Sequence, residues 1–177
     1  MSHPDLPDFD ETFDVVIVGS GAGGLSAAAI AAEGGASVLV LEKAARIGGT
    51  TRKSAAALWI PGNRFMREAG IDDRPEDVVR FLARIGRPAL YDPDAPRFGL
   101  PQWEYDMLIT FCENAATAQD ELERVGAMWL APSPFGISDY QGHRPENLNP
   151  VGRTLYEAET LGAANGGQVL VDRLAAG

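Results

Sequence analysis

The 177-residue chain is 45% hydrophobic and 23% charged, with a formal net charge of −10, which is the composition of a folded globular domain. So acidic a balance argues against nucleic acid or an anionic membrane as partner, because neutralising phosphate needs clustered Lys and Arg, and no apolar run approaches the ~18 residues that span a bilayer. Cys112 is the only cysteine, so no intrachain disulfide can form, and with no signal-like N-terminal pattern we expect a cytoplasmic protein.

A βαβ unit is predicted near the N-terminus. Residues 1–12 have little apolar content and are predicted to be a disordered lead-in. The β-branched run 13–18 predicts a buried strand, the alanine-rich stretch 25–33 predicts a helix that ends at a glycine pair, and the apolar run 37–41 predicts a second strand. A crossover of this kind is right-handed and joins parallel strands.

The rest of the chain reads as helices separated by loops. Asp73 is predicted to be the N-cap of a helix with Pro75 in its first turn and its end at Gly86. The remaining predicted elements are a helix over 102–125, a short strand over 128–130, an ordered loop over 131–149 and a helix over 168–176. Two parallel strands with open edges cannot bury both faces of a sheet. We therefore expect a truncated piece of a larger protein, which is unstable or aggregates when isolated.

A glycine-rich pattern lies between the first predicted strand and the first predicted helix. Gly19, Gly21 and Gly24 form Gly-x-Gly-x-x-Gly, and in this context the pattern indicates dinucleotide binding. Gly19 permits a tight turn, Gly21 lets the backbone approach a pyrophosphate, and Gly24 lets the helix pack close to the strand. Ala22 and Gly23 lie in the turn that precedes the predicted helix, and the N–H groups at the start of that helix suit phosphate. The alternative is that the glycines only shape a tight turn.

The stretch after the second predicted strand favours FAD over NAD. Glu42 ends that strand, where a carboxylate accepts hydrogen bonds from a ribose diol. Residues 43–54 hold four basic residues and no acid, with a glycine pair before Thr50 and Thr51, which suits a loop that binds phosphate or ribitol oxygens. The small residues 54–57 would let a flat isoalloxazine ring approach the backbone. The alternatives are a solvated basic loop and a tight packing contact by the alanines.

These segments together resemble the succinate dehydrogenase/fumarate reductase flavoprotein superfamily. The segments that carry the resemblance are Gly19-x-Gly21-x-x-Gly24, Glu42-Lys43, Gly48-Gly49-Thr50-Thr51, Ser54-Ala55-Ala56-Ala57-Leu58-Trp59-Ile60-Pro61-Gly62-Asn63 and Gly152-Arg153-Thr154-Leu155. The stretch that ends in Trp-Ile-Pro-Gly-Asn is most similar to the 3-ketosteroid Δ1-dehydrogenase branch. The resemblance implies an α/β fold: a partial Rossmann-like FAD-binding domain of the GR2 type over 13–63, a helical substrate-facing insertion over 64–150, and a return to the FAD domain over 151–177.

The resemblance also implies FAD as the cofactor and a set of residues that bind it. The implied FAD-binding residues are Gly19, Gly21, Ala22, Gly23, Gly24, Glu42, Lys43, Gly49, Thr50, Thr51, Ser54, Ala55, Ala56 and Ala57. Glu42 would hold the adenosine ribose, the glycine-rich turn would face the pyrophosphate, Thr50 and Thr51 would lie near the phosphates and ribitol, and the three alanines would lie near the flavin ring. Many relatives carry glycines where this chain has the alanines. No metal site is predicted.

The implied reaction removes or adds two hydrogens across a carbon–carbon bond beside a carbonyl or carboxylate, one as hydride through the flavin and one as a proton through the protein. The implied partners are a steroid-like ketone or unsaturated acid and an external electron acceptor. Tyr140 is the candidate catalytic residue, since it matches the first of two adjacent tyrosines in the ketosteroid branch, whereas Gln141 replaces the second. A fumarate-reductase-like enzyme, a non-catalytic nucleotide-binding module and an inactive fragment are the alternatives.

Overall fold

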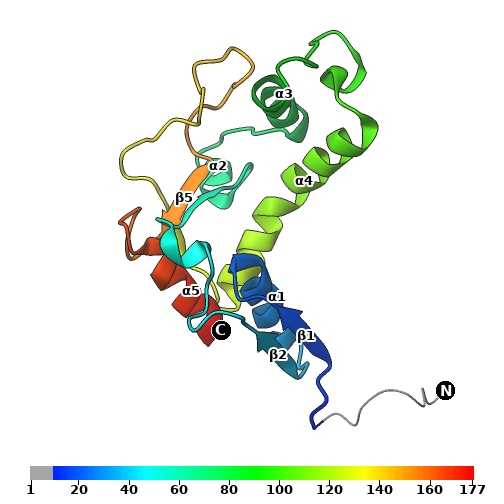
Figure 1. Cartoon of the computed structure of the whole chain (residues 1–177). Helices are drawn as coiled ribbons and strands as arrows, with labels where there is room; N and C mark the ends of the chain where they lie inside the picture. Colours follow the sequence, from blue (N-terminus) through cyan, green and yellow to red (C-terminus); the bar gives the residue numbers. More distant parts are fainter. Residues whose placement is uncertain (1–9) are drawn as a thin grey trace, which may run out of the picture.

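The computed structural model describes residues 10–177, and the predicted lead-in lies mostly outside them. The N-terminal unit consists of β1 (Val15–Val18), α1 (Ala22–Glu33) and β2 (Val38–Leu41), seen at the bottom of Figure 1. β1 and β2 pair in parallel, in register from their first to their last residues. The predicted parallel βαβ unit is therefore confirmed, and α1 begins three residues earlier than predicted.

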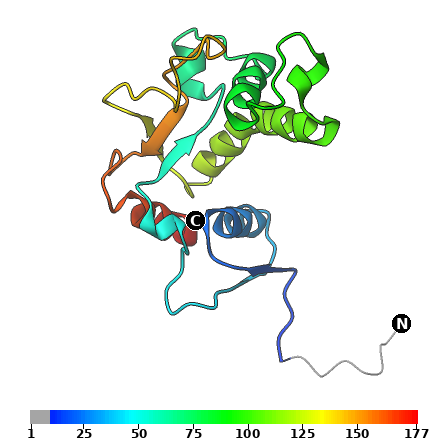
Figure 2. The same ribbon diagram turned by 45° about the horizontal axis from the view of Figure 1, so that its top comes forward.

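The β1–β2 pair is covered on one face only. α1 packs against one side of it, as Figure 2 shows, because Val15 and Ile17 alternate with residues that point the other way. The side chains of the opposite face are open to solvent, with Val16 53% exposed and Val18 85% exposed. Two apolar strands with one uncovered face agree with the expectation that a two-stranded sheet of this kind cannot bury both of its faces.

A second sheet was not predicted as such. It consists of β3 (Ala57–Trp59), β5 (Thr154–Glu157) and β4 (Leu130–Pro132), which are antiparallel in the order β3-β5-β4. β4 begins two residues after the start of the predicted strand 128–130. Strands of three or four residues are too short to show a clear alternating pattern, and β5 is brought to β3 from about 100 residues away in the sequence. This sheet takes one strand from each of the predicted segments 13–63, 64–150 and 151–177. It therefore does not separate the three segments, and their boundaries stay predictions.

The longer helices agree closely with the sequence pattern, whereas a five-residue helix and two short 3-10 helices were not predicted. They are α2 (Arg64–Glu68), α3 (Pro75–Gly86), α4 (Gln102–Arg124) and α5 (Gly166–Ala176), with short 3-10 helices η1 (Thr51–Lys53) and η2 (Pro96–Gly99). The prediction of Asp73 as the N-cap of α3 is wrong, because Arg74 is the N-cap and Pro75 the first residue. The Asp73 carboxylate instead accepts hydrogen bonds from the Gly62 N–H and from Arg153.

Two apolar clusters hold these elements together. The larger one joins α1, α5, the second sheet and the end of α4 around Leu155 and Val171. The smaller one lies between α3 and α4 around Val78 and Val79. Burying each such side chain contributes about 1.5–3 kcal/mol. Within residues 10–177, none of the helices has the length and apolar character needed to cross a bilayer.

Candidate functional site

The glycine-rich turn connects β1 directly to α1. Gly19 has a φ of +97°, which side chains rarely adopt, and its N–H donates to the Leu41 carbonyl at 2.8 Å. A Cβ added to Gly24 would lie 2.1 Å from the Gly19 carbonyl oxygen. The helix can therefore approach the turn only because position 24 has no side chain, as the sequence pattern predicts.

The N-terminus of α1 is free to receive an anion. Its N-cap, Gly21, makes no side-chain capping bond, and the first turn contains no acidic residue. The Ala22 N–H donates to the Thr51 hydroxyl at 3.1 Å, and a Cβ added at Gly23 would meet nothing within 4 Å. The Thr51 hydroxyl thus occupies one N–H of the first turn, and the remaining partial positive charge of the helix start, with open space beside it, suits the diphosphate of a dinucleotide.

Glu42 connects the end of β2 to this turn. Its carboxylate accepts hydrogen bonds from the Ser20 N–H at 3.1 Å, from the Ser20 hydroxyl, and from the Ala44 N–H at 2.8 Å. The Ser20 hydroxyl, followed by these two N–H groups, lowers the pKa of Glu42 to about 2. The carboxylate is therefore ionised at neutral pH and lies beside the turn, as a ribose-binding acid requires, although its ribose contact stays a prediction.

Ser20 is a site residue that the sequence analysis missed. It is fully buried, and its hydroxyl also accepts a hydrogen bond from the Gly48 N–H at 2.9 Å. One side chain thus fixes three segments to each other: the turn, the end of β2 and the loop that begins at Gly48. The sequence did contain a signal for this role, because Ser20, at the variable position after Gly19, is a small residue with a hydroxyl group.

The loop over 48–54 is seated by the start of α5, a second feature that the sequence analysis missed. A Cβ at Gly167 would lie 2.0 Å from the Thr51 carbonyl oxygen, and one at Gly166 would lie 2.5 Å from that of Ala55. The Gly167 N–H donates to the Ser54 carbonyl at 2.8 Å. The glycine pair at 166–167 therefore permits the helix to contact the loop backbone. The sequence signal for this contact was the pair of glycines just before the predicted helix 168–176.

The three alanines that follow this loop differ in environment. Ala56 is buried and has a φ of 51°, whereas Ala57 is exposed and begins β3. The Ser54 hydroxyl accepts a hydrogen bond from the Ala56 N–H at 3.1 Å and fixes this conformation. The proximity of Ala55, Ala56 and Ala57 to a flavin ring stays a prediction.

A basic cavity of about 550 Å³ adjoins the same loop. Its lining residues are Ala44, Arg46, Ile47, Gly49, Thr50, Arg52, Lys53 and Gln168. Of the predicted site residues it contains Gly49 and Thr50, but not Lys43. One of its cations is partly neutralised, since Arg52 pairs with Asp172 at 3.1 Å. The remaining positive charge suits an acidic ligand such as a phosphate.

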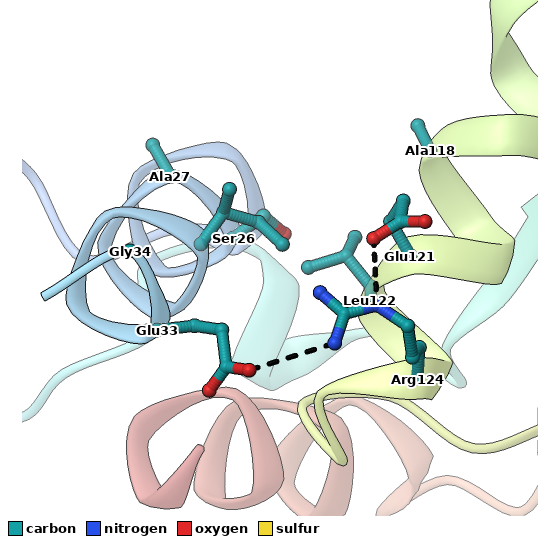
Figure 3. Close-up of a pocket in the computed structure, with 9 residues that line it drawn as sticks. Ser26, Ala27, Glu33, Gly34, Ala118, Glu121, Leu122 and Arg124 are labelled. Atoms are coloured by element: carbon teal, nitrogen blue, oxygen red, sulfur yellow. Dashed lines mark hydrogen bonds and ion pairs between the residues drawn. The ribbon is translucent and has the colours of Figure 1, made fainter.

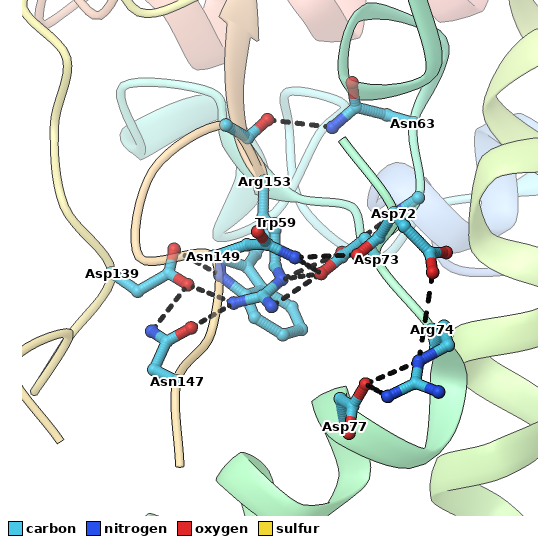
Figure 4. A network of polar contacts seen from close by, with 12 residues as sticks. Trp59, Asn63, Asp72, Asp73, Arg74, Asp77, Asp139, Asn147, Asn149 and Arg153 are labelled. Atoms are coloured by element: carbon cyan, nitrogen blue, oxygen red, sulfur yellow. Dashed lines mark hydrogen bonds and ion pairs between the residues drawn. The ribbon is translucent and has the colours of Figure 1, made fainter. Parts of the chain in front are cut away.

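Tyr140 is not part of this arrangement. Its side chain is 79% exposed, so its catalytic role stays a prediction. The neighbouring Asp139 is buried instead, and it accepts hydrogen bonds from Arg153 at 2.6 Å and from the indole N–H of Trp59 at 2.8 Å (Figure 4). The sequence analysis placed Arg153 in a family-like motif but missed that it organises the loop around Asp139.

Arg153 lies in a buried network of opposite charges. Its guanidinium contacts Asp73 at 2.6 Å, Asp139 at 2.6 Å and the side-chain oxygen of Asn147 at 2.8 Å (Figure 4). Burial alone would raise the pKa of Asp73, but Arg153, Asn149 and the Gly62 N–H together lower it below its ordinary value. All these groups have partners, so the network holds segments together and offers little to a ligand.

Another cavity, of about 690 Å³, lies between α1 and α4 (Figure 3). Arg124 spans it and pairs with Glu33 at 3.5 Å and with Glu121 at 2.9 Å. Ser26 and Leu122 form part of its wall. Because its charged groups already satisfy each other, this cavity is a weaker candidate than the turn at the start of α1.

Comparison with known proteins gives a consistent result. The family model described as FAD binding domain matches residues 14–177. The chain is 49% identical over 168 residues to 4-oxocyclohexanecarboxylate 2-dehydrogenase of Sinomonas cyclohexanicum, covering 86% of this chain and 29% of that protein. It is 46% identical over 75 residues to 3-oxosteroid 1-dehydrogenase of Mycobacterium tuberculosis, covering 42% of this chain and 13% of that protein.

A similar solved structure is that of 3-ketosteroid delta1-dehydrogenase from Sterolibacterium denitrificans in complex with 1,4-androstadiene-3,17-dione. The TM-score is 0.60 at 32% sequence identity, and the match covers 88% of this chain and 25% of that one. The chain thus spans less than a third of the length of each of these three proteins.

Proposed function

This chain belongs to the FAD binding domain family, and on that premise we propose that the first turn of α1 holds the diphosphate of FAD in an oxidoreductase. The observation that carries this proposal is the start of α1, where Glu42 accepts a hydrogen bond from the Ser20 N–H and the Thr51 hydroxyl accepts one from the Ala22 N–H. Three segments that are separate in sequence supply a helix dipole, a carboxylate and a hydroxyl to one place. A dinucleotide needs these groups for its phosphates and its ribose.

We assign the remaining contacts by position. Glu42 holds the adenosine ribose, and the cations of the basic cavity, Arg46 and Lys53 among them, offset the negative charge of the diphosphate. Thr50 lines that cavity and lies beside the ribitol. The backbone of Ala55, Ala56 and Ala57 faces the flavin ring. When bound, FAD supplies hydride transfer, and the protein supplies orientation and proton transfer.

The substrate class follows from the relatives. The names of both curated relatives describe the dehydrogenation of a ring that carries an oxo group. We propose that the protein removes two hydrogens from adjacent carbons beside the carbonyl of a cyclic ketone. As parts of the same proposal, it passes the electrons to an external acceptor and works in the cytoplasm, which the buried free thiol of Cys112 supports.

The test is a titration of the purified chain with FAD, followed by flavin absorbance and fluorescence. Glu42→Gln keeps the shape of the side chain but removes its charge, so its hydrogen bonds from the ribose hydroxyls lose their charge assistance and FAD binding should weaken roughly 10-fold. The matched control is Glu33→Gln at the far end of α1, which should bind FAD as the wild type does. A folded chain that takes up no FAD, or whose affinity is the same in both variants, would refute the proposal.

A further inference from the structure

Two serines of the N-terminal unit hold carboxylates in the same way, one at each end of the β1–β2 pair. Ser37 donates its N–H and its hydroxyl to Asp14, at 2.8 and 2.7 Å. Its hydroxyl also accepts the Asp14 N–H at 3.0 Å, so this exposed pair closes on itself. Ser20 likewise donates its N–H and its hydroxyl to Glu42, but it is 0% exposed and its hydroxyl accepts the N–H of a third segment, at Gly48. Of the two pairs, the buried one therefore reaches beyond the strands that it joins.

The hydrogen bonds of Ser20 fix the orientation of the Glu42 carboxylate. An ionised carboxylate has about four lone-pair sites. The N–H and the hydroxyl of Ser20 both donate to its Oε2 atom, and the Ala44 N–H donates to Oε1 at 2.8 Å. Oε1 is thus the oxygen with room for a ligand hydroxyl, and the carboxylate is oriented before any ligand arrives. A preorganised acceptor of this kind loses little conformational entropy on binding.

The same hydroxyl fixes the beginning of the loop over 48–54. Gly48 has a φ of +105°, and its N–H donates to the Ser20 hydroxyl at 2.9 Å. A Cβ at this position would lie 2.8 Å from Val171 of α5, so the backbone is enclosed from that side as well. Three residues further along, the Thr51 hydroxyl accepts the Ala22 N–H at the start of α1. Releasing Gly48 from Ser20 would therefore free the part of the loop that places Thr51 at the helix.

We infer that Ser20 is a positioning residue for FAD, whose hydroxyl orients the Glu42 carboxylate towards the adenosine ribose and holds the loop over 48–54 beside the diphosphate. This inference rests on the proposed function, because both contacts belong to the proposed FAD site. Ser20 acts through Glu42 and Gly48 rather than by touching the cofactor. Its loss should therefore reduce the recognition of the ribose hydroxyls, which a serine that only supports the fold would not do.

The test compares ADP with 2′,3′-dideoxy-ADP, which lacks both ribose hydroxyls. FAD uptake by the wild-type chain is first confirmed from flavin absorbance, so that failure of the proposed function is seen separately. Calorimetry on the FAD-free chain then gives the affinities of the two nucleotides. We expect the wild type to prefer ADP roughly 10-fold, as a charge-assisted hydrogen bond implies, and Ser20→Ala to reduce this preference to about 2- to 3-fold.

Three further variants make the outcome specific. Ser20→Thr keeps the hydroxyl and should retain the preference for ADP. Ser20→Cys has nearly the shape of serine but is a weak donor, and it should lose the preference even if the alanine variant does not fold. Ser37→Ala is the matched control, because it removes the same kind of hydroxyl from Asp14 at the opposite end of the strands, and it should retain the full preference.

A second measurement needs no ligand. The Ser20 hydroxyl is the largest of the contacts that lower the pKa of Glu42 to about 2, so carbon NMR should show this carboxyl titrating at a higher pH in the alanine and cysteine variants. Ser37→Ala should instead raise the pKa of Asp14, which the Ser37 hydroxyl lowers. A preference for ADP that survives in both Ser20 variants, or a Glu42 pKa that does not move, would overturn the inference alone. A folded wild-type chain that takes up no FAD would refute the proposed function and this inference with it.

Discussion

Replacing Arg153 by methionine tests whether the charge network governs the stability of this chain. Arg153 is 1% exposed, and its guanidinium is enclosed by the carboxylates of Asp73 and Asp139, each at 2.6 Å. Methionine keeps the apolar stem of the side chain but removes the cation. The two carboxylates then remain buried without the charge that neutralises them.

The magnitude follows from the burial of all three groups. Removing one partner of a buried ion pair costs about 3–5 kcal/mol, and at about 2–4 °C per kcal/mol for a chain of this size the melting temperature should fall by roughly 6–20 °C. A typical domain has a free energy of unfolding of only about 5–15 kcal/mol. Arg153→Met should therefore remove a large part of the total stability.

Urea unfolding followed by far-UV circular dichroism measures this loss. The control is Arg124→Met, whose guanidinium pairs with Glu33 and Glu121 while all three side chains are more than half exposed. An exposed pair contributes about 0–1 kcal/mol. If Arg153→Met loses no more stability than Arg124→Met, the reasoning from burial is wrong.

The pH dependence gives a second check on the same variant. In the wild type the pKa of Asp73 is lowered, so its contribution to stability is present above its unfolded-state pKa and is lost as the pH falls. Without Arg153, burial raises the pKa of this carboxyl instead, and protonation relieves the buried charge. The stability gap between variant and wild type should therefore narrow as the pH falls from 7 towards 4. A gap that widens would contradict the assignment.

Three further predictions concern separate features. Gly24→Ala places a Cβ 2.1 Å from the Gly19 carbonyl oxygen and should cost about 1–3 kcal/mol in urea unfolding and weaken FAD binding, whereas Gly23→Ala, with nothing within 4 Å, should leave stability equal or higher. Burial raises the pKa of Cys112 to about 12, so a thiol reagent should label it only as fast as the chain opens, and rapid labelling of the native chain would contradict this. The stability that the neutral thiol contributes should be lost as the pH rises above about 9, where the thiol of the unfolded chain ionises and the buried one does not. Val18→Lys on the bare sheet face, where Val18 is 85% exposed, should reduce self-association in size-exclusion chromatography without changing the unfolding midpoint, and unchanged association would show that this face is not the cause.

The local parts of the fold were predictable because their patterns are contained within single segments. The strand, glycine turn and helix of the N-terminal unit occupy consecutive residues, and their periodicities of 2 and 3.6 are visible in the sequence. Helix α4 was predicted to within one residue at its end. Glu42 was predicted at the end of the second strand as a ribose-binding acid, and the hydrogen bond that its carboxylate accepts from the Ser20 N–H at 3.1 Å places it beside the turn.

The parts that were not predictable depend on contacts between distant segments. Asp73 has the sequence context of an N-cap, but a buried arginine 80 residues later takes its carboxylate. The three-stranded sheet could not be predicted from the periodicity of apolar residues for the same reason, since β5 pairs with strands from two other regions of the chain. In each case a tertiary contact decided between two local structures that the sequence permitted equally.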